Sequence, residues 1–373
     1  MKIQILQEEL TKGLATVSRF VSSRPQLPIL ANILLSAEEG KIALSATDLN
    51  LGINYWLKGK IEKEGKIAIP AREVTEFVSY LAPGPLDLVL ENNILIISSQ
   101  SNRASFVGIS GKEFPKIPQL DEKSAFALNK EEFVKAVGEV SFAAANDETR
   151  PVLEGIYWQF TPDGYQMVAT DGYRLSLKKV KTKRGSQEKI VFLVPARSLE
   201  EVVKLGGEEE EIKVGLSEDK NQVVFAFSQG EVSSRLLEGN FPEYEKIIPQ
   251  EGKTKVWLDK DDFYAAVKAA SVFARESANV VILNVDKKEL TVKADAPQMG
   301  ENQNTISIKA EGEPIKIAFN FRFLLDFLNA VSLEKKDLVL EFTQPLSPAL
   351  FKLEGDDSWL HVIMPVRLEE TQT

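Results

Sequence analysis

Apolar residues recur at helical spacing in three places along the chain. The three stripes are Leu10, Leu14, Val17 and Val21, then Phe133, Val137, Val140 and Ala144, then Phe263, Val267, Ala270 and Ala274. Steps of four, three and four residues place the members of a stripe on one face of an α-helix. The pattern therefore predicts three amphipathic helices, each at the start of a similar unit.

A second pattern repeats with nearly the same period. Arg72, Arg197 and Arg322 each follow a short apolar run, and they stand 125 residues apart. After each arginine the spacing of apolar residues changes from alternating to helical. This change predicts a strand followed by a second helix in every unit.

A short polar corner between two apolar runs is the third repeated feature. It reads Ala169-Thr170-Asp171-Gly172-Tyr173-Arg174-Leu175 in the middle unit, Ala46-Thr47-Asp48-Leu49-Asn50-Leu51 in the first, and Lys293-Ala294-Asp295-Ala296-Pro297, a degraded form, in the third. The aspartates stand 123 and 124 residues apart. We expect a strand, a tight corner and a strand, with the aspartate accepting backbone N–H bonds at the corner. Gly172 permits a positive φ there and leaves the neighbouring backbone uncovered.

A period near 125 residues has the size of a whole domain and far exceeds the roughly 20–50 residues of a solenoid repeat. Alternating apolar positions predict that strands fill most of each unit between its two helices. The sequence thus predicts an α+β protein of three tandem domains, at residues 1–121, 122–252 and 253–373. The proline-containing segments 115–121 and 242–253 are the expected linkers.

Composition narrows the chemistry further. The 373 residues include no Cys and a single His, which excludes a disulfide framework, thiolate metal sites and thiol–imidazole catalysis. The chain has no phosphate-binding loop of the G-x-x-x-x-G-K-[ST] kind and no apolar run near the roughly 20 residues of a membrane span. Met1 leads straight into an alternating strand, so we expect no signal peptide. A formal charge of −10 argues against a protein that coats nucleic acid, although it allows a local basic lining.

Some reactive side chains have plain structural interpretations. His361 is expected to be a half-buried residue of a terminal strand. Five cations within residues 178–184 favour a solvated loop between strands. Carboxylate chemistry would need Asp48, Asp171 and Asp295 together, but equivalent positions in separate domains lie far apart. We therefore predict no catalytic residues, no metal and no cofactor.

Four separated phrases resemble one protein family. Residues 23–30, 169–175, 239–244 and 364–368 are similar to the bacterial DNA polymerase III β subunit, the replicative sliding clamp, and the resemblance covers the whole chain in order. It implies a head-to-tail homodimeric ring around duplex DNA, with helices lining the hole and antiparallel sheets outside. It also implies a non-catalytic processivity factor of DNA replication in the cytoplasm, associated with the nucleoid. Such a ring is opened by a clamp loader and tethers the replicative polymerase, repair polymerases and mismatch-repair proteins.

The resemblance also implies a hydrophobic pocket between the second and third domains, where client proteins dock linear peptide motifs. The positions carried over are Leu153, Thr170, Gly172, Tyr173, Arg174, Leu175, Pro242, Lys246, Ile247, Asn320, Phe323, Pro348, Val362, Ile363, Met364, Pro365, Val366, Arg367 and Leu368. Tyr173 stands where the family usually has His, Lys246 where it has Arg, Val366 where it has Met, and Ala278 where some members have a large aromatic residue. The preferred motif therefore remains open.

DNA and subunit contacts have expected positions too. Lys12, Arg19 and Lys135 fall opposite the apolar stripes at about 100° per residue, although Glu8 and Glu131 fall on comparable faces. Further candidates for the DNA lining are Arg24, Arg72, Arg150 and Arg197. For the dimer, the edge strand at 103–109 carries Arg103 and Phe106, and we expect Phe106 to pack against Val272 and Phe273 of the partner subunit.

Two other classes of function stay open at this point. One is an interaction scaffold that never encircles DNA, which retention on nicked circular DNA would distinguish. The other is a hydrolase that uses the three aspartates, which an Asp171→Asn substitution would disable.

Overall fold

Antiparallel pairing between strands of different repeats organises this protein. The computed structural model describes residues 1–22, 25–121, 125–147, 149–182, 190–205, 209–217, 219–332, 334 and 337–368. The chain divides into two compact units, the first made of Met1–Glu131 with Glu201–Leu236 and the second of Glu132–Glu200 with Leu237–Thr373. The middle third of the sequence therefore contributes to both units.

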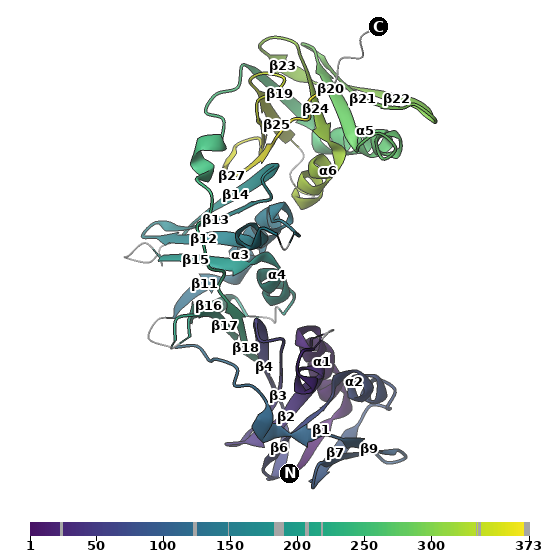
Figure 1. The fold of residues 1–373 in the computed structure, drawn as a ribbon, viewed down its shortest axis with the longest axis vertical. Helices are drawn as coiled ribbons and strands as arrows, with labels where there is room; N and C mark the ends of the chain where they lie inside the picture. Colours follow the sequence, from purple (N-terminus) through teal and green to yellow (C-terminus); the bar gives the residue numbers. More distant parts are fainter. Residues whose placement is uncertain are drawn as a thin grey trace. The chain divides into compact units, whose positions relative to one another are not determined.

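The first unit contains two helices side by side, α1 (Gln7–Val17) and α2 (Ala71–Ser79) (Figure 1). Leu10, Leu14 and Val17 of the predicted stripe are buried, and a short 3₁₀ turn, η1 (Ser18–Phe20), ends α1 before Val21. The first helix is thus confirmed, but it is shorter than the stripe.

Two antiparallel sheets complete the first unit. The five-stranded sheet has the order β5 (Gly59–Lys63), β1 (Lys2–Leu6), β7 (Pro85–Glu91), β8 (Ile94–Ser98), β9 (Arg103–Val107). The nine-stranded sheet has the order β10 (Ile109–Ser110), β6 (Gly65–Pro70), β2 (Asn32–Glu38), β3 (Lys41–Thr47), β4 (Leu51–Leu57), β18 (Gly230–Arg235), β17 (Gln222–Phe227), β16 (Glu211–Leu216), β11 (Phe126–Asn129).

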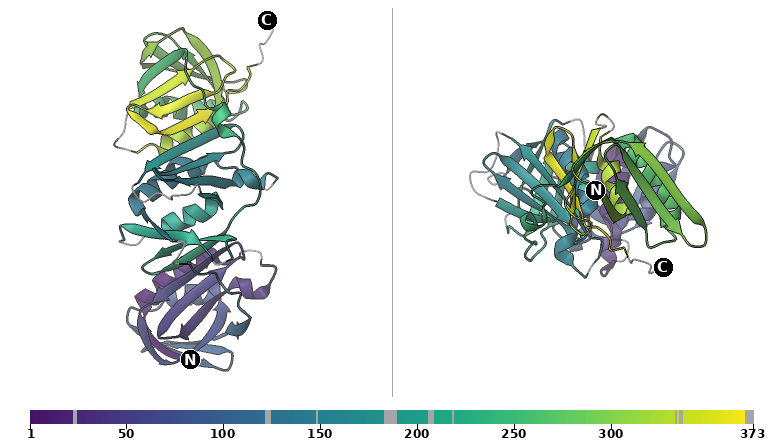
Figure 2. Two further views of the ribbon diagram at one scale, coloured as in Figure 1. Left: turned by 90° about the vertical axis from the view of Figure 1, so that its left-hand side faces the viewer. Right: turned by 90° about the horizontal axis from the view of Figure 1, so that it is seen from above.

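The second unit repeats this architecture. Its nine-stranded sheet has the order β15 (Ile190–Pro195), β12 (Gly155–Thr161), β13 (Gly164–Thr170), β14 (Arg174–Lys181), β27 (Asp356–Ile363), β26 (Ala349–Leu353), β25 (Asp337–Phe342), β19 (Thr254–Asp259), β23 (Lys309–Glu311). Its four-stranded sheet has the order β22 (Gly300–Ser307), β21 (Glu289–Ala296), β20 (Val280–Val285), β24 (Ile315–Asn320). Figure 2 shows β25, β26 and β27 side by side, in yellow-green and yellow.

Four more helices are found where the repeat predicts them. They are α3 (Lys130–Val140), α4 (Ala196–Lys204), α5 (Lys260–Ala274) and α6 (Phe321–Ala330). Helix α5 lies against β21 and β22 (Figure 1). Phe263, Val267, Ala270 and Ala274 are all buried in the core of the second unit, as the third apolar stripe predicts.

The pairing of β4 with β18, and of β14 with β27, explains why the compact units cut across the repeats. Each pair joins the corner-forming strand of one repeat to the last strand of the next. Such pairing gives the backbone N–H and C=O groups of both strand edges a partner. The sheets are therefore continuous where domain boundaries were expected.

Three structural expectations need correction. Residues 178–181 belong to β14, and Lys178 is buried, so they are not a solvated loop, while 183 and 184 lie outside the described residues. His361 is fully buried rather than half-buried, because its strand β27 lies inside the nine-stranded sheet. Asp295 is in the strand β21 and does not fasten a corner.

Candidate functional site

The corner between β13 and β14 is held by a compact set of side-chain hydrogen bonds. The Asp171 Oδ1 atom accepts bonds from the backbone N–H groups of Tyr173 (2.8 Å) and Arg174 (3.0 Å). The Thr170 hydroxyl accepts a bond from the Gly172 N–H (3.1 Å) and donates one to the Arg174 carbonyl (2.6 Å). Gly172 has φ +91°, so the predicted corner and the role of its aspartate are confirmed.

Arg174 anchors this corner to the helix α6. Its Nε atom lies 3.1 Å from Asp171 Oδ2, and its terminal nitrogen lies 2.5 Å from Asp326 Oδ2. The guanidinium carbon lies 4.7 Å from the centre of the Phe323 ring and 5.6 Å from that of Phe142. The Arg174 side chain is consequently only 9% exposed.

The segment that follows β27 runs along the same corner. The Met364 N–H donates to the Tyr173 carbonyl at 2.8 Å, and the Val366 N–H donates to the Ala318 carbonyl at 2.8 Å. These two bonds bring residues from the middle and last thirds of the chain into one place. Pro365 and Val366 are half-buried, while Met364 is exposed.

Apolar side chains around the corner divide into a buried and an exposed group. Leu175 and Val362 pair across β14 and β27 and are almost fully buried, with Tyr244 and Leu350, in one small cluster. They are therefore not an open wall of a pocket. Tyr173 (61% exposed) and its bonded neighbour Met364 (38%) reach the surface, as does Ile247 (44%) in the 3₁₀ turn η6 (Tyr244–Ile247) that carries the cluster residue Tyr244.

The other predicted pocket residues lie in the second unit as well. Leu153 is buried in the short turn η5 (Pro151–Glu154), and Pro348 is half-buried before β26. Asn320 caps α6 by accepting a bond from the Arg322 N–H at 3.0 Å. Pro242 and Lys246 are exposed, and Lys246 forms an ion pair with Glu243.

Several residues of this site could not be chosen from the motifs. Asp326 and Phe142 both contact Arg174, but neither belongs to a phrase that marks the repeat. Asp326 stands three residues after Phe323, so one helical turn places both near the corner. That spacing is a signal in the sequence, although the partner Arg174 is 152 residues away.

His361 on β27 pairs with Ser176 of β14, two residues along the strand from Arg174. Its ring stacks on Phe327, with 5.3 Å between centroids and 10° between planes, and lies 5.2 Å from the Phe142 ring. Burial lowers the pKa of His361 well below its usual value, and the positive charge of Arg174 lowers it further, against a raising effect of the Leu175 backbone. His361 is therefore neutral at pH 7.

The cations proposed for DNA do not gather into one site. Lys12 and Arg72 are exposed in the first unit, and Lys135, Arg150 and Arg197 are exposed in the second. Arg19 is half-buried, with its Nε atom 3.7 Å from Glu201 Oε2. Arg24 lies outside the described residues.

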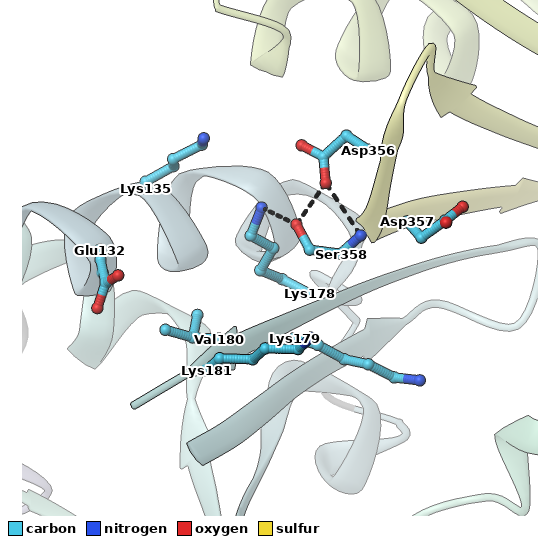
Figure 3. Close-up of a pocket in the computed structure, with 9 residues that line it drawn as sticks. All are labelled: Glu132, Lys135, Lys178, Lys179, Val180, Lys181, Asp356, Asp357 and Ser358. Atoms are coloured by element: carbon cyan, nitrogen blue, oxygen red, sulfur yellow. Dashed lines mark hydrogen bonds between the residues drawn. The ribbon is translucent and has the colours of Figure 1, made fainter. Parts of the chain in front are cut away.

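Lys135 borders a hollow of about 630 Å³ in the second unit (Figure 3). Lys178 points toward Ser358 there and donates to its hydroxyl at 2.9 Å, while Glu139 Oε2 lies 2.6 Å from the same amine. Burial raises the pKa of Glu139, against the lowering effect of Lys178. Lys178 is already paired with Glu139 and Ser358, so its charge is not available to bind an anion in this hollow.

Two sheet edges carry the residues expected at the subunit contact. Strand β9 is the last strand of its sheet, and Phe106 packs against Phe77 with 5.5 Å between ring centroids. Strand β22 is an edge of the four-stranded sheet. Near it, Val272 on α5 is 50% exposed, while Phe273 packs against the core.

Within the part of the chain that the structure describes, no group of three or more His, Cys, Asp or Glu residues could hold a metal ion. In that same part, no helix is long and apolar enough to cross a membrane.

Comparison with known proteins agrees with this geometry along the full chain. Three domain families of the DNA polymerase III beta subunit match, the N-terminal domain at residues 1–118, the central domain at 127–243 and the C-terminal domain at 245–367. The Beta sliding clamp of Synechococcus elongatus is 33% identical over 99% of this chain and 100% of its own length.

Solved structures are similar over the same extent. The DNA polymerase sliding clamp from Bacillus subtilis has a TM-score of 0.94 and 27% identity, covering 99% of this chain and all of that one. A sliding clamp from Bartonella birtlesii, solved bound to griselimycin, has a TM-score of 0.93 and 28% identity over the same shares. The chain thus belongs to the bacterial DNA polymerase III beta subunit family, the three-domain sliding clamps that act as non-catalytic processivity factors in DNA replication.

Proposed function

We propose that this clamp tethers client proteins through a short linear peptide that docks beside the 170–175 corner. One observation carries the proposal: the Met364–Tyr173 backbone bond brings the terminal segment against a glycine-containing corner. Exposed Met364, Ile247 and Tyr173 then offer apolar surface near the backbone of Gly172, which has no side chain of its own and which the Arg150 guanidinium adjoins, since an added Cβ would lie 3.0 Å from Arg150 Nη1. Such surface suits one or two large apolar anchors of a partner.

The binding strength can be bounded from burial. Two apolar anchors contribute about 1.5–3 kcal/mol each, less the cost of ordering a flexible peptide. Micromolar binding corresponds to about −8 kcal/mol, so polar contacts along the peptide backbone must contribute too. Replicative and repair polymerases, the clamp loader and mismatch-repair proteins are the clients that this family implies.

We also propose that two copies close into a head-to-tail ring around duplex DNA. Pairing of β9 of one copy with β22 of the other would cover two open sheet edges at each of two equivalent contacts. The exposed lysines and arginines would then contact phosphates without reading sequence. We place the three domains of each subunit at residues 1–121, 122–252 and 253–373.

The test of the client site is a pair of truncations. Ending the chain after Ile363 removes the bonds made by Met364 and Val366, and we expect peptide affinity to be lost while the dimer remains. Ending it after Leu368 is the matched control, and affinity should be unchanged. Peptide titration beside sedimentation would measure both, and retained affinity in the shorter protein would refute the site.

The ring has a separate test. A loaded clamp should stay on nicked circular DNA and be lost when that DNA is linearised, because a ring is held by topology. An interaction scaffold would behave alike on both DNA forms. Phe106→Ala should shift the protein toward monomer, since burying one such aromatic side chain contributes about 1.5–3 kcal/mol per contact.

A further inference from the structure

Arg174 is an enclosed cation at the proposed peptide site. Its side chain is 9% exposed, and it contacts two carboxylates, Asp171 at 3.1 Å and Asp326 at 2.5 Å. Asp171 belongs to the corner itself, whereas Asp326 belongs to α6. The guanidinium therefore connects the corner to a helix from another third of the chain.

Aromatic rings cover the guanidinium as well. Phe323 and Phe142 lie 4.7 Å and 5.6 Å from its carbon, distances at which a cation is attracted to a ring. The series continues from Phe142 to His361 at 5.2 Å, and from His361 to Phe327 at 5.3 Å. Side chains from β14, β27, α6 and η4 (Ser141–Ala143) thus pack in one continuous series.

The charges of Arg174, Asp171 and Asp326 decide whether this cluster could attract a charged group of a partner. The guanidinium of Arg174 faces two carboxylates, so the cluster has no net positive charge that could attract an acidic group of a partner. By contrast, Arg150 and Arg367 are exposed. The planar guanidinium of Arg174 presents several N–H donors in a fixed arrangement, so it can hold two carboxylate oxygens in defined positions. A lysine ammonium lacks this fixed geometry.

We propose that Arg174 is a positioning residue, which fastens the corner carrying Gly172 and Tyr173 to α6 through Asp326 and does not read the charge of the client. This rests on the proposed peptide site. The corner backbone must be held in place, because Tyr173 also accepts the bond from Met364. Recognition of the peptide then depends on the fixed backbone and the exposed apolar side chains around it.

The experiment uses the full-length protein and two peptides with Leu and Phe anchors that differ only in Glu or Gln at one position. Arg174→Gln should weaken both peptides by about tenfold, the order expected for charged hydrogen bonds, and leave their affinity ratio within about twofold. Asp326→Asn should act in the same direction, and the double variant should be no weaker than Arg174→Gln alone. Arg322→Gln, an equal charge change at an exposed position of α6, is the control and should alter affinity by less than about twofold.

Hydrogen exchange of the unliganded protein provides a second measurement. In Arg174→Gln, the amides of Gly172, Tyr173 and Met364 should exchange faster, while amides of α5 should not. If the wild-type clamp bound neither peptide, the proposed function would fail. Hydrogen exchange would still test whether Arg174 fastens the corner to α6. Two results would overturn the proposal: unchanged exchange at the corner, or selective loss of the Glu peptide in Arg174→Gln with normal binding in Asp326→Asn.

Discussion

The corners at 47–52 and 170–175 share one backbone frame but present different surfaces. Thr47 accepts from the Leu49 N–H and donates to the Leu51 carbonyl, and Asp48 accepts from the N–H groups of Asn50 and Leu51. Thr170 and Asp171 make the same bonds in the same order. The pairing of Thr47 with Gly52 likewise matches that of Thr170 with Leu175.

This register aligns the side chains that differ. Leu49 (φ +77°) stands where Gly172 is, Leu51 where Arg174 is, and Gly52 where Leu175 is. On the neighbouring strands, Ser233 and Val232 of β18 stand where β27 has Val362 and His361. A Cβ on Gly52 would lie 3.1 Å from Ile117, so the first corner has no room for a side chain like Leu175.

Residues that both corners share hold the backbone, whereas residues found only at the second corner surround the proposed peptide site. Threonine and aspartate are kept at both corners because the backbone needs acceptors there. A glycine at positive φ, Arg174 and the buried pair of Leu175 and Val362 occur only at the second corner, where we propose the peptide site. In the third repeat Asp295 instead lies 3.2 Å from Lys293, within a hairpin strand, and even the frame is absent.

The largest expected effect is on the frame itself. Asp171→Ala removes two backbone bonds and one Arg174 bond, each to a charged acceptor, and should raise the free energy of the closed corner by about 3 kcal/mol. Asp48→Ala removes only two backbone bonds, and we expect about 1–2 kcal/mol. Hydrogen exchange at 172–174 and 49–51 would measure the local opening. Equal effects at both corners would show that Arg174 adds nothing to the second.

Exchanging the residues at positive φ comes next. Gly172→Leu should lower the free energy of unfolding by about 1–2 kcal/mol. The cost should stay this small because Leu49 already has a positive φ at the equivalent position of the first corner. It should also abolish peptide binding by covering the backbone. Leu49→Gly is the matched control and should leave peptide affinity as it is. Normal peptide binding by Gly172→Leu would mean that the peptide does not approach this backbone.

The buried imidazole predicts a smaller, pH-dependent difference. The folded-state pKa of His361 is depressed, so its contribution to stability is full above about pH 6.5 and is lost as the pH falls below that value. His361→Val introduces the residue that β18 has at the equivalent position, Val232. This substitution should remove about 1 kcal/mol of the change in unfolding free energy between pH 7 and 5.5. Melting temperatures of both proteins at these two pH values give the difference. A variant with the wild-type slope would assign the titration to other groups.

The smallest effects should be similar in size in the first two repeats. Lys12 and Lys135 occupy matching positions on α1 and α3, and both are exposed. Lys12→Ala and Lys135→Ala should each weaken DNA binding by less than about threefold and reduce the slope against salt by at most about 0.9. Lys135 should have the smaller effect of the two, because Glu139 lies 3.9 Å from it. DNA affinity measured over a series of salt concentrations tests this, and a tenfold loss from one variant alone would contradict a diffuse lining.

Local features of this protein were determined by its sequence. Period-3.6 stripes predicted the helices α1, α3 and α5, and an aspartate at a strand corner predicted the bonds of Asp48 and Asp171, because both depend on residues close together in the chain. The threefold repeat predicted three copies of one fold for the same reason. Family resemblance then supplied the proposal of a peptide site, which the motifs alone did not contain.

Only the tertiary structure decided which distant residues meet. Lys178 and His361 carry polar signals but are buried, because β14 and β27 pair inside a nine-stranded sheet. The contact of Arg174 with Asp326 joins positions 152 residues apart, and no local pattern encodes such a pairing. Leu175 and Val362 became core rather than open surface for the same reason: strand pairing across repeats covers them with Tyr244 and Leu350. Long-range pairing satisfies strand edges, and the side chains that it encloses depend on register rather than on their own polarity.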